Sequence, residues 1–364
     1  MRKETTIPRS VIKNYLEAKE RSRVNILSYE KLGSGWHGTG YKIRYKVQGT
    51  RDKGKTKEVV IRTLMPEGFS HDYLSDRAKV FILQHEMSKS IPGHVKSLDV
   101  SGYSKSNELI SLGDIKEYFQ VVEVAGGRSY SEDFSRIKKT GVLNDEDRKK
   151  ALLISDYLVQ LHGKKYKGTA DEERSIRRRH TRDAIGHGEM MMGVIDTYPD
   201  DFQFITKDGL SELICKTVKF REKIKDVPFV PRRIHGDFHP GNILFDKKKI
   251  IVLDASRELY GDAGDDVCAM AINYIWFAVM QSGEFGGSFS ELFRLFWDNY
   301  MKKTNDELIQ KTAGVHFAFR GVVVAHPVFY SDQSDDTRKK MIKFVNNVLD
   351  SEMFDASRIN DYLG

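Results

Sequence analysis

The sequence predicts an α+β protein in two parts, an antiparallel sheet followed by a mostly helical segment. Apolar and polar residues alternate at Tyr41–Val47, as they do in half-buried strands, and an apolar segment follows at 58–64. Further along the chain, apolar residues recur at helical spacing instead. Strands first and helices afterwards are typical of the α+β class, so we expect one part at 1–125 and a second at 126–364.

The N-terminal part is expected to hold a small sheet, a leading helix and one long helix. Residues 1–25 carry apolar residues at helical spacing, which predicts the leading helix. Residues 75–91 have the same period and stop at a Pro-Gly pair, which is a helix-ending signal. Further strands are predicted at 95–100 and 118–124.

The C-terminal part is expected to consist of helices around one short hairpin. Strand signals remain only at 243–245 and 250–253. Helical periodicity predicts helices at 146–162, 210–224, 267–280, 290–300 and 339–349.

Composition narrows the class of protein. The 59 basic and 52 acidic residues are interspersed, so the net charge of +7 does not indicate a nucleic-acid-binding surface. Cys215 and Cys268 form no disulfide framework and no metal-ligand pattern. The N-terminus lacks the apolar stretch of a signal peptide, and no apolar segment is long enough to span a membrane. We therefore expect a cytoplasmic protein with no membrane partner, of an oligomeric state that the sequence does not indicate.

The stretch RRIHGDFHPGNILF, residues 232–245, concentrates chemically active side chains. His235, Asp237, His239 and Asn242 lie within eight residues. Asp237 is the carboxylate available to accept a proton from an attacking hydroxyl group. It precedes Asn242 by five positions, the D-x-x-x-x-N spacing of a kinase catalytic loop. The stretch therefore predicts phosphoryl transfer.

A hairpin is predicted to bring a metal-binding pair together after this stretch. If the hairpin folds about Lys248, Ile243 lies opposite Leu253 and Asn242 lies beside Asp254. An amide oxygen and a carboxylate about 5 Å apart can share a divalent cation. Oxygen ligands without a thiolate favour Mg²⁺ over zinc.

A glycine-rich segment near the N-terminus predicts a phosphate-binding loop. Gly33, Gly35 and Gly38 stand as G-x-G-x-x-G, where backbone N–H groups can approach phosphate oxygens closely. The segment lies in a strand-like context, which favours a kinase-type loop over a dinucleotide-binding turn.

The following strand offers a cation for the phosphates. Arg62 occupies the position where a phosphate-pairing cation is expected. Asp76 and Glu86, both in the predicted helix 75–91, are candidates to orient it, and the sequence does not choose between them.

The motif resembles that of a known family. His235–Leu244, HGDFHPGNIL, is similar to the H-G-D-x-H-x-x-N-x-L signature of the aminoglycoside phosphotransferase and choline kinase group, which has a bilobal protein-kinase-like fold. Residues 261–267, GDAGDDV, resemble the family's G-D-P-x-x-D-L-A segment, with Ala263 at the proline position. Residues 158–162, LVQLH, resemble its helix that ends in Leu-His. The resemblance covers roughly residues 28 to 280.

The resemblance implies roles for the residues of the motif. Asp237 would be the catalytic base, Asn242 and Asp254 the magnesium ligands, and His235 a residue that braces the loop. Two acids in the next segment, Asp262 and Asp266, are expected to cap and anchor the helix that follows them.

The resemblance also implies the reaction and its partners. The γ-phosphoryl group of ATP would pass, with Mg²⁺, to a hydroxyl group of a small molecule, and the sequence does not distinguish ATP from GTP. Residues 122–126, VEVAG, would form the hinge that meets adenine, with Glu123 and Ala125 as the contacts. Arg62 departs from the usual strand lysine, which presents its charge differently.

Two alternatives stay open. Loss of the usual lysine favours a pseudokinase, a nucleotide-binding regulatory module. His235, Asp237 and His239 in H-x-D-x-H spacing would suit a metal-dependent hydrolase, although no further ligand cluster accompanies them.

The acceptor molecule is less well determined. Residues 174–189 are rich in arginine, which favours an anionic or neutral acceptor over a polycationic aminoglycoside if the segment lines the acceptor site. Within it, the GHGE segment at 186–189 is either a turn that faces the substrate or a helix end.

Overall fold

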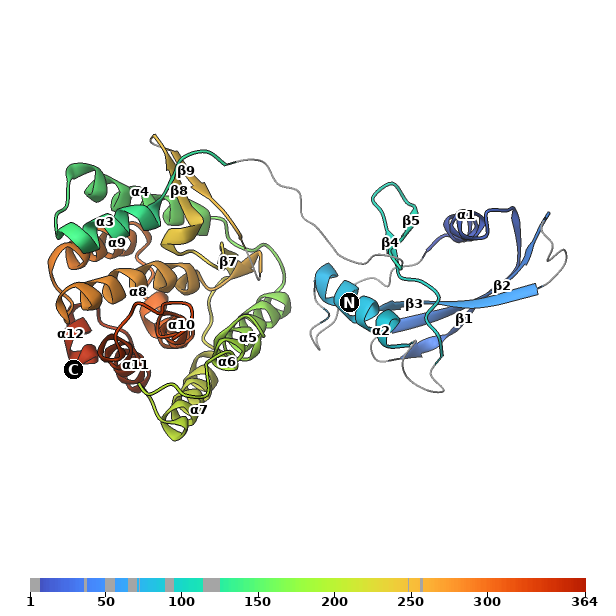
Figure 1. Ribbon diagram of the computed structural model, residues 1–364. Helices are drawn as coiled ribbons and strands as arrows, with labels where there is room; N and C mark the ends of the chain where they lie inside the picture. Colours follow the sequence, from blue (N-terminus) through green and yellow to red (C-terminus); the bar gives the residue numbers. More distant parts are fainter. Residues whose placement is uncertain are drawn as a thin grey trace. The chain divides into compact units, whose positions relative to one another are not determined.

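A computed structural model of the chain describes residues 7–35, 38–49, 56–64, 71, 73–88, 95–113, 125–247, 249–255 and 258–364. The chain divides into two compact units, Met1–Val122 and Glu123–Gly364, which are described in turn (Figure 1). No helix within the described ranges is both long and apolar enough to cross a membrane.

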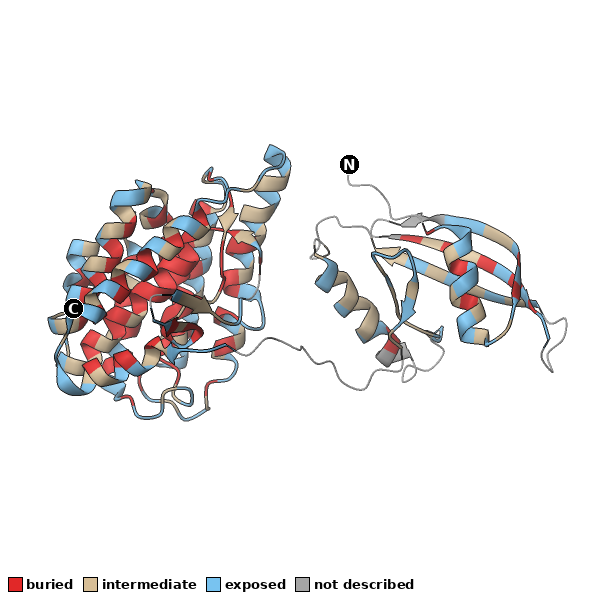
Figure 2. Ribbon diagram, turned by 90° about the horizontal axis from the view of Figure 1, so that it is seen from above, coloured by how far each residue is buried: buried red, intermediate tan, exposed pale blue. Residues whose placement is uncertain are grey.

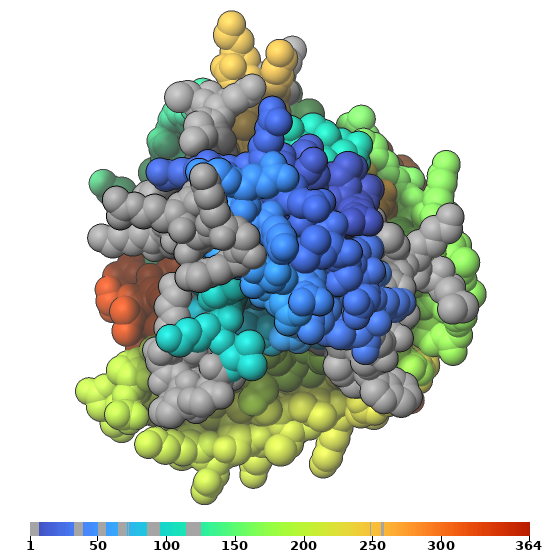
Figure 3. All heavy atoms as spheres, turned by 90° about the vertical axis from the view of Figure 1, so that its right-hand side faces the viewer, coloured from blue at the N-terminus to red at the C-terminus, as the bar shows by residue number. Residues whose placement is uncertain are grey.

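The first unit is built on an antiparallel sheet of order β1-β2-β3. Its elements are α1 (Arg9–Glu20), β1 (Val24–Gly35), β2 (Gly38–Val47), β3 (Thr56–Leu64), α2 (Leu74–Ser88), β4 (Ser101–Tyr103) and β5 (Leu109–Ser111). Ile12 and Leu16, one helical turn apart on α1, are buried against residues of the first two strands such as Ile26 and Ile43. In Figure 3 the atoms of α1 and of β1 to β3, drawn in shades of blue, form one continuous surface.

One strand prediction in this unit was wrong. Residues 95–100 form no strand, and the pairing begins at Ser101, where β4 meets β5. The Asp99 side chain accepts hydrogen bonds from Ser111 Oγ at 2.9 Å and from the Gly113 N–H at 3.1 Å. One backbone bond, from the Leu112 N–H to the Val100 carbonyl at 2.7 Å, continues the pairing, and at Asp99 side-chain bonds take its place. The predicted strand at 118–124 lies wholly outside the described residues.

The second unit is mostly helical. Its helices are α3 (Tyr130–Thr140), α4 (Asp145–His162), α5 (Ala170–Gly186), α6 (Met191–Ile195), α7 (Lys207–Ile224), α8 (Ala263–Ser282), α9 (Gly287–Thr304), α10 (Leu308–Val324), α11 (Asp335–Asp350) and α12 (Ile359–Leu363). Its short strands are β6 (Arg128–Ser129), β7 (Arg232–Arg233), β8 (Ile243–Asp246), β9 (Lys249–Val252) and β10 (Tyr260–Gly261). The predicted order, antiparallel strands first and helices afterwards, is confirmed.

The core of this unit lies around α8 and α10. Both helices are buried along almost their whole length, as the red ribbons of Figure 2 show. They pack against each other, α8 also against α9, and α10 also against α11. The five predicted helices are present, but α10 was not predicted. Its apolar residues surround the helix instead of forming one stripe, so helical periodicity is weak.

The hairpin of β8 and β9 has a register that differs from the prediction by one residue. Ile243 pairs with Val252 and Asp246 with Lys249, which leaves a two-residue turn. Lys247, the first residue of that turn, has a φ of 56°, as two-residue hairpin turns require. The prediction of a turn centred on Lys248 was therefore wrong.

Candidate active site

The loop that carries the motif is held through its backbone by Asp266 on α8. The N–H groups of His235 and Gly236 donate to the two carboxylate oxygens of Asp266, at 2.7 and 2.9 Å. His162, at the end of α4, lies 3.2 Å from the same carboxylate through Nε2 and 2.7 Å from the Tyr300 hydroxyl through Nδ1. Asp266 thus anchors the loop that carries the motif. The sequence analysis predicts instead that Asp266 caps and anchors its own helix.

The capping task belongs to Asp262. Its Oδ1 accepts from the Gly264 N–H at 2.8 Å at the start of α8. Its Oδ2 lies 3.1 Å from Nε2 of His316 on α10. Burial opposes ionisation, but the hydrogen bond and the charge of His316 outweigh it and hold the pKa of Asp262 below its ordinary value.

Asp237 lies at the end of the anchored backbone and is partly exposed. Its side chain is 25% accessible. Arg320 Nη1 donates to Oδ1 at 2.6 Å, and Asn242 Nδ2 donates to Oδ2 at 3.3 Å. His239 Nε2 lies 3.7 Å from Oδ2. The carboxylate is therefore fixed in direction and still within reach of a ligand.

Arg320 is the residue that the sequence analysis missed. It lies on α10, 6% accessible, and its Nη2 also donates to the Gly236 carbonyl and to Asp265 Oδ1, each at 3.1 Å. Burial lowers the pKa of Arg320, but the charges of Asp265 and Asp237 raise it above the ordinary value, so the guanidinium is charged. The sequence holds one signal for this residue, since Arg320 stands alone within the apolar run AFRGVVV. An arginine in such a run is expected to be buried, and a buried charge needs acidic partners.

The predicted metal pair, Asn242 and Asp254, lies at the open end of the hairpin but in a different pairing. The Leu253 N–H donates to the Asn242 carbonyl at 2.9 Å, so Leu253 and not Asp254 is opposite Asn242. Asp254, with a φ of 53°, leaves the strand and is exposed. The amide nitrogen of Asn242 donates to the Asp237 carbonyl at 3.0 Å, which leaves its amide oxygen as the potential metal ligand.

The two histidines of the motif serve the loop itself. His235 Nδ1 accepts from the Asp237 N–H at 3.3 Å, and His239 Nδ1 accepts from the Gly241 N–H at 3.1 Å. His235 is buried and its ring lies edge to face against Phe238, with centroids 5.6 Å apart. With one nitrogen of each ring bonded to local backbone, the arrangement favours a bracing role over a shared metal.

Residues 198–289, which include the whole motif and the whole of α8, match the model of the phosphotransferase enzyme family. This segment is therefore similar to the family that the motif resembles. The suspected family and the expected class of enzyme, a small-molecule phosphotransferase, are confirmed. No curated protein matches the sequence.

Solved structures of three kinases show weak similarity to the chain. An amicoumacin kinase in complex with AMP-PNP, Ca²⁺ and Ami is 14% identical at a TM-score of 0.43, over 97% of this chain and 100% of that one. A glucosamine kinase complex is 14% identical at 0.40, over 65% and 62%. A thermostable aminoglycoside phosphotransferase with ADP and hygromycin B is 14% identical at 0.39, over 93% and 98%. Similarity at this level carries no argument about this chain.

The family match includes no residue of the first unit, so the roles of the N-terminal candidates stay predictions. Gly33 and Gly35 end β1 and Gly38 begins β2, so the glycine-rich segment is the connection of a hairpin. Arg62 lies on β3 and pairs with Gly40 of β2, one strand away from that segment.

The remaining candidates of the first part are only partly described. Asp76 accepts from the Tyr73 N–H at 2.8 Å at the start of α2. The side chain of Glu86 and the whole of Glu123 lie outside the described residues. Ala125 is exposed in the segment before β6.

The segment rich in arginine forms helix α5, and its charges are largely paired within the second unit. Arg178 meets Asp226 at 2.7 Å, and Arg179 meets Asp183 at 3.2 Å. The GHGE segment begins where α5 ends at Gly186, so it is a helix end. The sequence argument for an anionic acceptor therefore loses its support.

Proposed function

We propose that the chain transfers the γ-phosphoryl group of ATP to a hydroxyl group of a small molecule, with Asp237 as the general base. The observation that carries the proposal is the setting of Asp237. One oxygen is fixed by Arg320 at 2.6 Å, while a quarter of the side chain remains accessible to a ligand. A base must lie within hydrogen-bond reach of the proton that it accepts, and an oriented, partly exposed carboxylate meets that requirement.

The support for Asp237 is built in successive layers. The backbone on its N-terminal side is bound by Asp266, and the Asn242 amide closes the loop on its C-terminal side. Because these bonds fix the loop before a substrate arrives, little ordering is left for the bound state. This arrangement suits a hydroxyl acceptor whose proton leaves as the phosphoryl group is transferred.

Mg²⁺ fits the donors at the open end of the hairpin. The Asn242 amide oxygen and the Asp254 carboxylate are hard oxygen donors. The two chain segments that carry them are joined by the hydrogen bond from the Leu253 N–H to the Asn242 carbonyl. The ion would neutralise phosphate charge when bound. Asn242 and Asp254 would hold it, and Asp237 would accept the proton.

The nucleotide contacts of the first unit belong to the same proposal. Gly33, Gly35 and Gly38 would approach the phosphates through backbone N–H groups, and Arg62 would pair with phosphate charge. Glu123 and Ala125 would meet the base of the nucleotide. The proposal leaves the choice between ATP and GTP open.

The test is a Mg-ATP assay against a panel of hydroxylated small molecules, with product detected by mass spectrometry. We expect Asp237→Asn to lower kcat by roughly 10²–10⁴-fold, the usual contribution of a general base. Asp246→Asn is the matched control because Asp246 is exposed at the hairpin tip. Turnover by Asp237→Asn at the wild-type rate would refute the mechanism.

The alternatives predict different outcomes of the same assay. A pseudokinase would bind Mg-ATP without phosphorylating any acceptor on a broad panel. A hydrolase would release product without nucleotide and would depend on His235 and His239 as metal ligands.

A further inference from the structure

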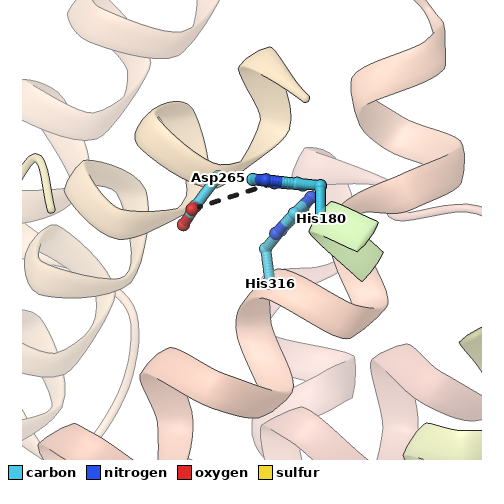
Figure 4. Close-up of side chains that lie close together, drawn as sticks. All are labelled: His180, Asp265 and His316. Atoms are coloured by element: carbon cyan, nitrogen blue, oxygen red, sulfur yellow. Dashed lines mark ion pairs between the residues drawn. The ribbon is translucent and has the colours of Figure 1, made fainter. Parts of the chain in front are cut away.

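Three buried side chains from three helices lie close together in the second unit. His180 lies on α5, Asp265 on α8 and His316 on α10, and Figure 4 shows their side chains close together. Their side chains are 4%, 0% and 0% accessible. One nitrogen or oxygen atom of each lies within 4.8 Å of those of the other two. Within the described ranges no other histidine, cysteine or acid cluster meets this criterion.

Both histidines leave one ring nitrogen without a hydrogen bond. His180 Nε2 and His316 Nδ1 are buried and have no hydrogen-bond partner. The Asp265 Oδ2 atom lies 3.9 Å from His180 Nε2, too far for a hydrogen bond. Buried polar atoms without a partner are rare in folded proteins, and these two belong to residues whose ligand atoms gather with Asp265 within 4.8 Å of one another, which points to a ligand that joins them.

The opposite nitrogen of each ring faces a carboxylate. His180 Nδ1 lies 3.5 Å from Glu258 Oε2, and His316 Nε2 lies 3.1 Å from Asp262 Oδ2. Metal-binding histidines commonly donate their second N–H to a carboxylate, which fixes the tautomer and strengthens the ligand. Asp262 is such a partner for His316, whereas the contact of His180 with Glu258 Oε2 is longer than a hydrogen bond.

The local charge also calls for a cation. Asp262, Asp265 and Glu258 are buried together. Arg320 Nη2 lies 3.1 Å from Asp265 Oδ1 and Arg179 Nε lies 3.7 Å from Glu258 Oε1, but each guanidinium group is shared with a second acid, Asp237 and Asp183 respectively. Buried carboxylates are stable when they are paired or bind a metal, so additional positive charge would stabilise this cluster.

We propose that His180, Asp265 and His316 bind a divalent transition-metal ion, with Zn²⁺ the ion that the donors favour. Two imidazoles and one carboxylate are a donor set of zinc sites, whereas Mg²⁺ prefers oxygen ligands. The site is distinct from the proposed magnesium pair, Asn242 and Asp254. With ligand bonds of about 2.0–2.1 Å, the donors would draw somewhat closer together than in the structure.

A surface pocket lies beside His180. The pocket, of about 30 Å³, is lined by Arg179, His180, Asp183, His187, Met190 and Glu258. Neither Asp265 nor His316 lines it, so the pocket borders the cluster on the side of Glu258. The bound ion would hold α5, α8 and α10 together. Asp265 also bonds Arg320, which orients Asp237, so the ion would secure the base indirectly.

The first experiment measures metal in the whole chain, purified without a metal-affinity tag. We expect close to one zinc per chain by elemental analysis, and a visible spectrum of tetrahedral type when Co²⁺ replaces it. Addition of Zn²⁺ to chelator-treated protein should raise Tm. These readouts do not depend on kinase activity, so they are separate from the test of the proposed function.

Variants then locate the ion. His180→Gln and His316→Gln should lose the stoichiometric metal, and Glu258→Gln should weaken Co²⁺ binding by about 10–100-fold through the outer shell. His187→Gln is the matched control because it lines the pocket but lies outside the cluster. Circular dichroism checks that each variant is folded, and the wild-type Co²⁺ titration needs no variant.

Two results would overturn the proposal. One is wild-type protein that holds no stoichiometric metal and gives no Tm shift or Co²⁺ spectrum with added ion. The other is metal retained at full stoichiometry in a folded His180→Gln/His316→Gln double variant. Protonated histidines seen by NMR in metal-free protein that does not bind Co²⁺ would identify a proton as the occupant.

Discussion

Arg320 on α10 donates from Nη1 to Oδ1 of Asp237 at 2.6 Å, although 83 positions separate the two residues in the chain. The same guanidinium bonds Gly236 and Asp265. A planar group with several donors in fixed directions can reach these three acceptors at once, whereas a lysine carries its three donors on one nitrogen atom. The direction of the proposed base is therefore set by a helix that lies outside the motif.

Arg320→Lys should separate catalysis from substrate binding. We expect kcat to fall while KM for ATP changes little, because the positioning of Asp237 is lost but the proposed nucleotide contacts are not. The free energy of unfolding should fall by about 3–5 kcal/mol if the buried Asp265 loses its partner, and by less if the lysine reaches it. Steady-state kinetics and urea unfolding give the two quantities.

Arg148→Lys, at an exposed ion pair with Glu291, is the control. Unchanged kcat in Arg320→Lys would show that the bond to Asp237 is structural only.

Asp266→Asn should destabilise the loop that carries the motif. An amide NH₂ would face a backbone N–H of His235 or Gly236, so one donor would lose its acceptor. Each buried donor left unpaired costs about 1–3 kcal/mol of unfolding free energy. Urea unfolding measures the loss. Asp156→Asn, which removes a surface pair with Lys303, should change stability by less than about 1 kcal/mol. Equal losses in both variants would contradict the anchoring role of Asp266.

Asp254→Asn should raise the Mg²⁺ concentration that gives half-maximal rate, by about tenfold or more, because ligand charge sets the affinity of such sites. Asp254 is the cleaner test than Asn242, whose amide also bonds the loop at the Asp237 carbonyl. Initial rates over a Mg²⁺ titration at saturating ATP give the shift, and Asp246→Asn should leave it unchanged. A Mg²⁺ dependence identical to that of the wild type would remove Asp254 from the metal site.

His326 should make stability fall in mild acid. Its Nδ1 accepts from the Val328 and Phe329 N–H groups, each at 3.1 Å, so the proton lies on Nε2, which faces Thr197 Oγ1 at 2.9 Å. Burial lowers the pKa of His326 below its ordinary value, with a smaller contribution from the charge of Arg338 and an opposing one from the Thr197 bond. Protonation of Nδ1 would break both backbone bonds.

The sign of the pH effect follows from that direction. The native state prefers neutral His326, so its contribution is fully present above the pKa of about 6.5 in the unfolded chain and is lost as pH falls toward the lower native pKa. We expect the free energy of unfolding to decline between about pH 7 and pH 5. His326→Asn, which keeps an acceptor for the two N–H groups, should flatten this decline. His187→Asn, at an exposed histidine, should leave it unchanged. A decline of equal slope in His326→Asn would assign it to other groups.

Local sequence was sufficient where a feature depends on near neighbours. The helices at 146–162 and 267–280 were predictable because apolar residues recur with the helical period. Asp237 and Asn242 were identifiable because they lie five positions apart in one loop. The hairpin was predicted as well, but its register was not, because a turn of two or three residues fits the same apolar pattern.

The sequence by itself determined the family, the α+β order of elements and the oxygen donors of the motif, since each depends on residue type and short spacing. The tertiary structure decided which distant groups surround them. Only the packing of α10 against α8 brings Arg320 to Asp237 and His316 to Asp265, because these contacts join helices whose separation in sequence leaves no periodic signal. Because His316 and Arg320 lie in an apolar helix, the sequence indicates that both side chains need polar partners. Only the fold shows which residues those partners are.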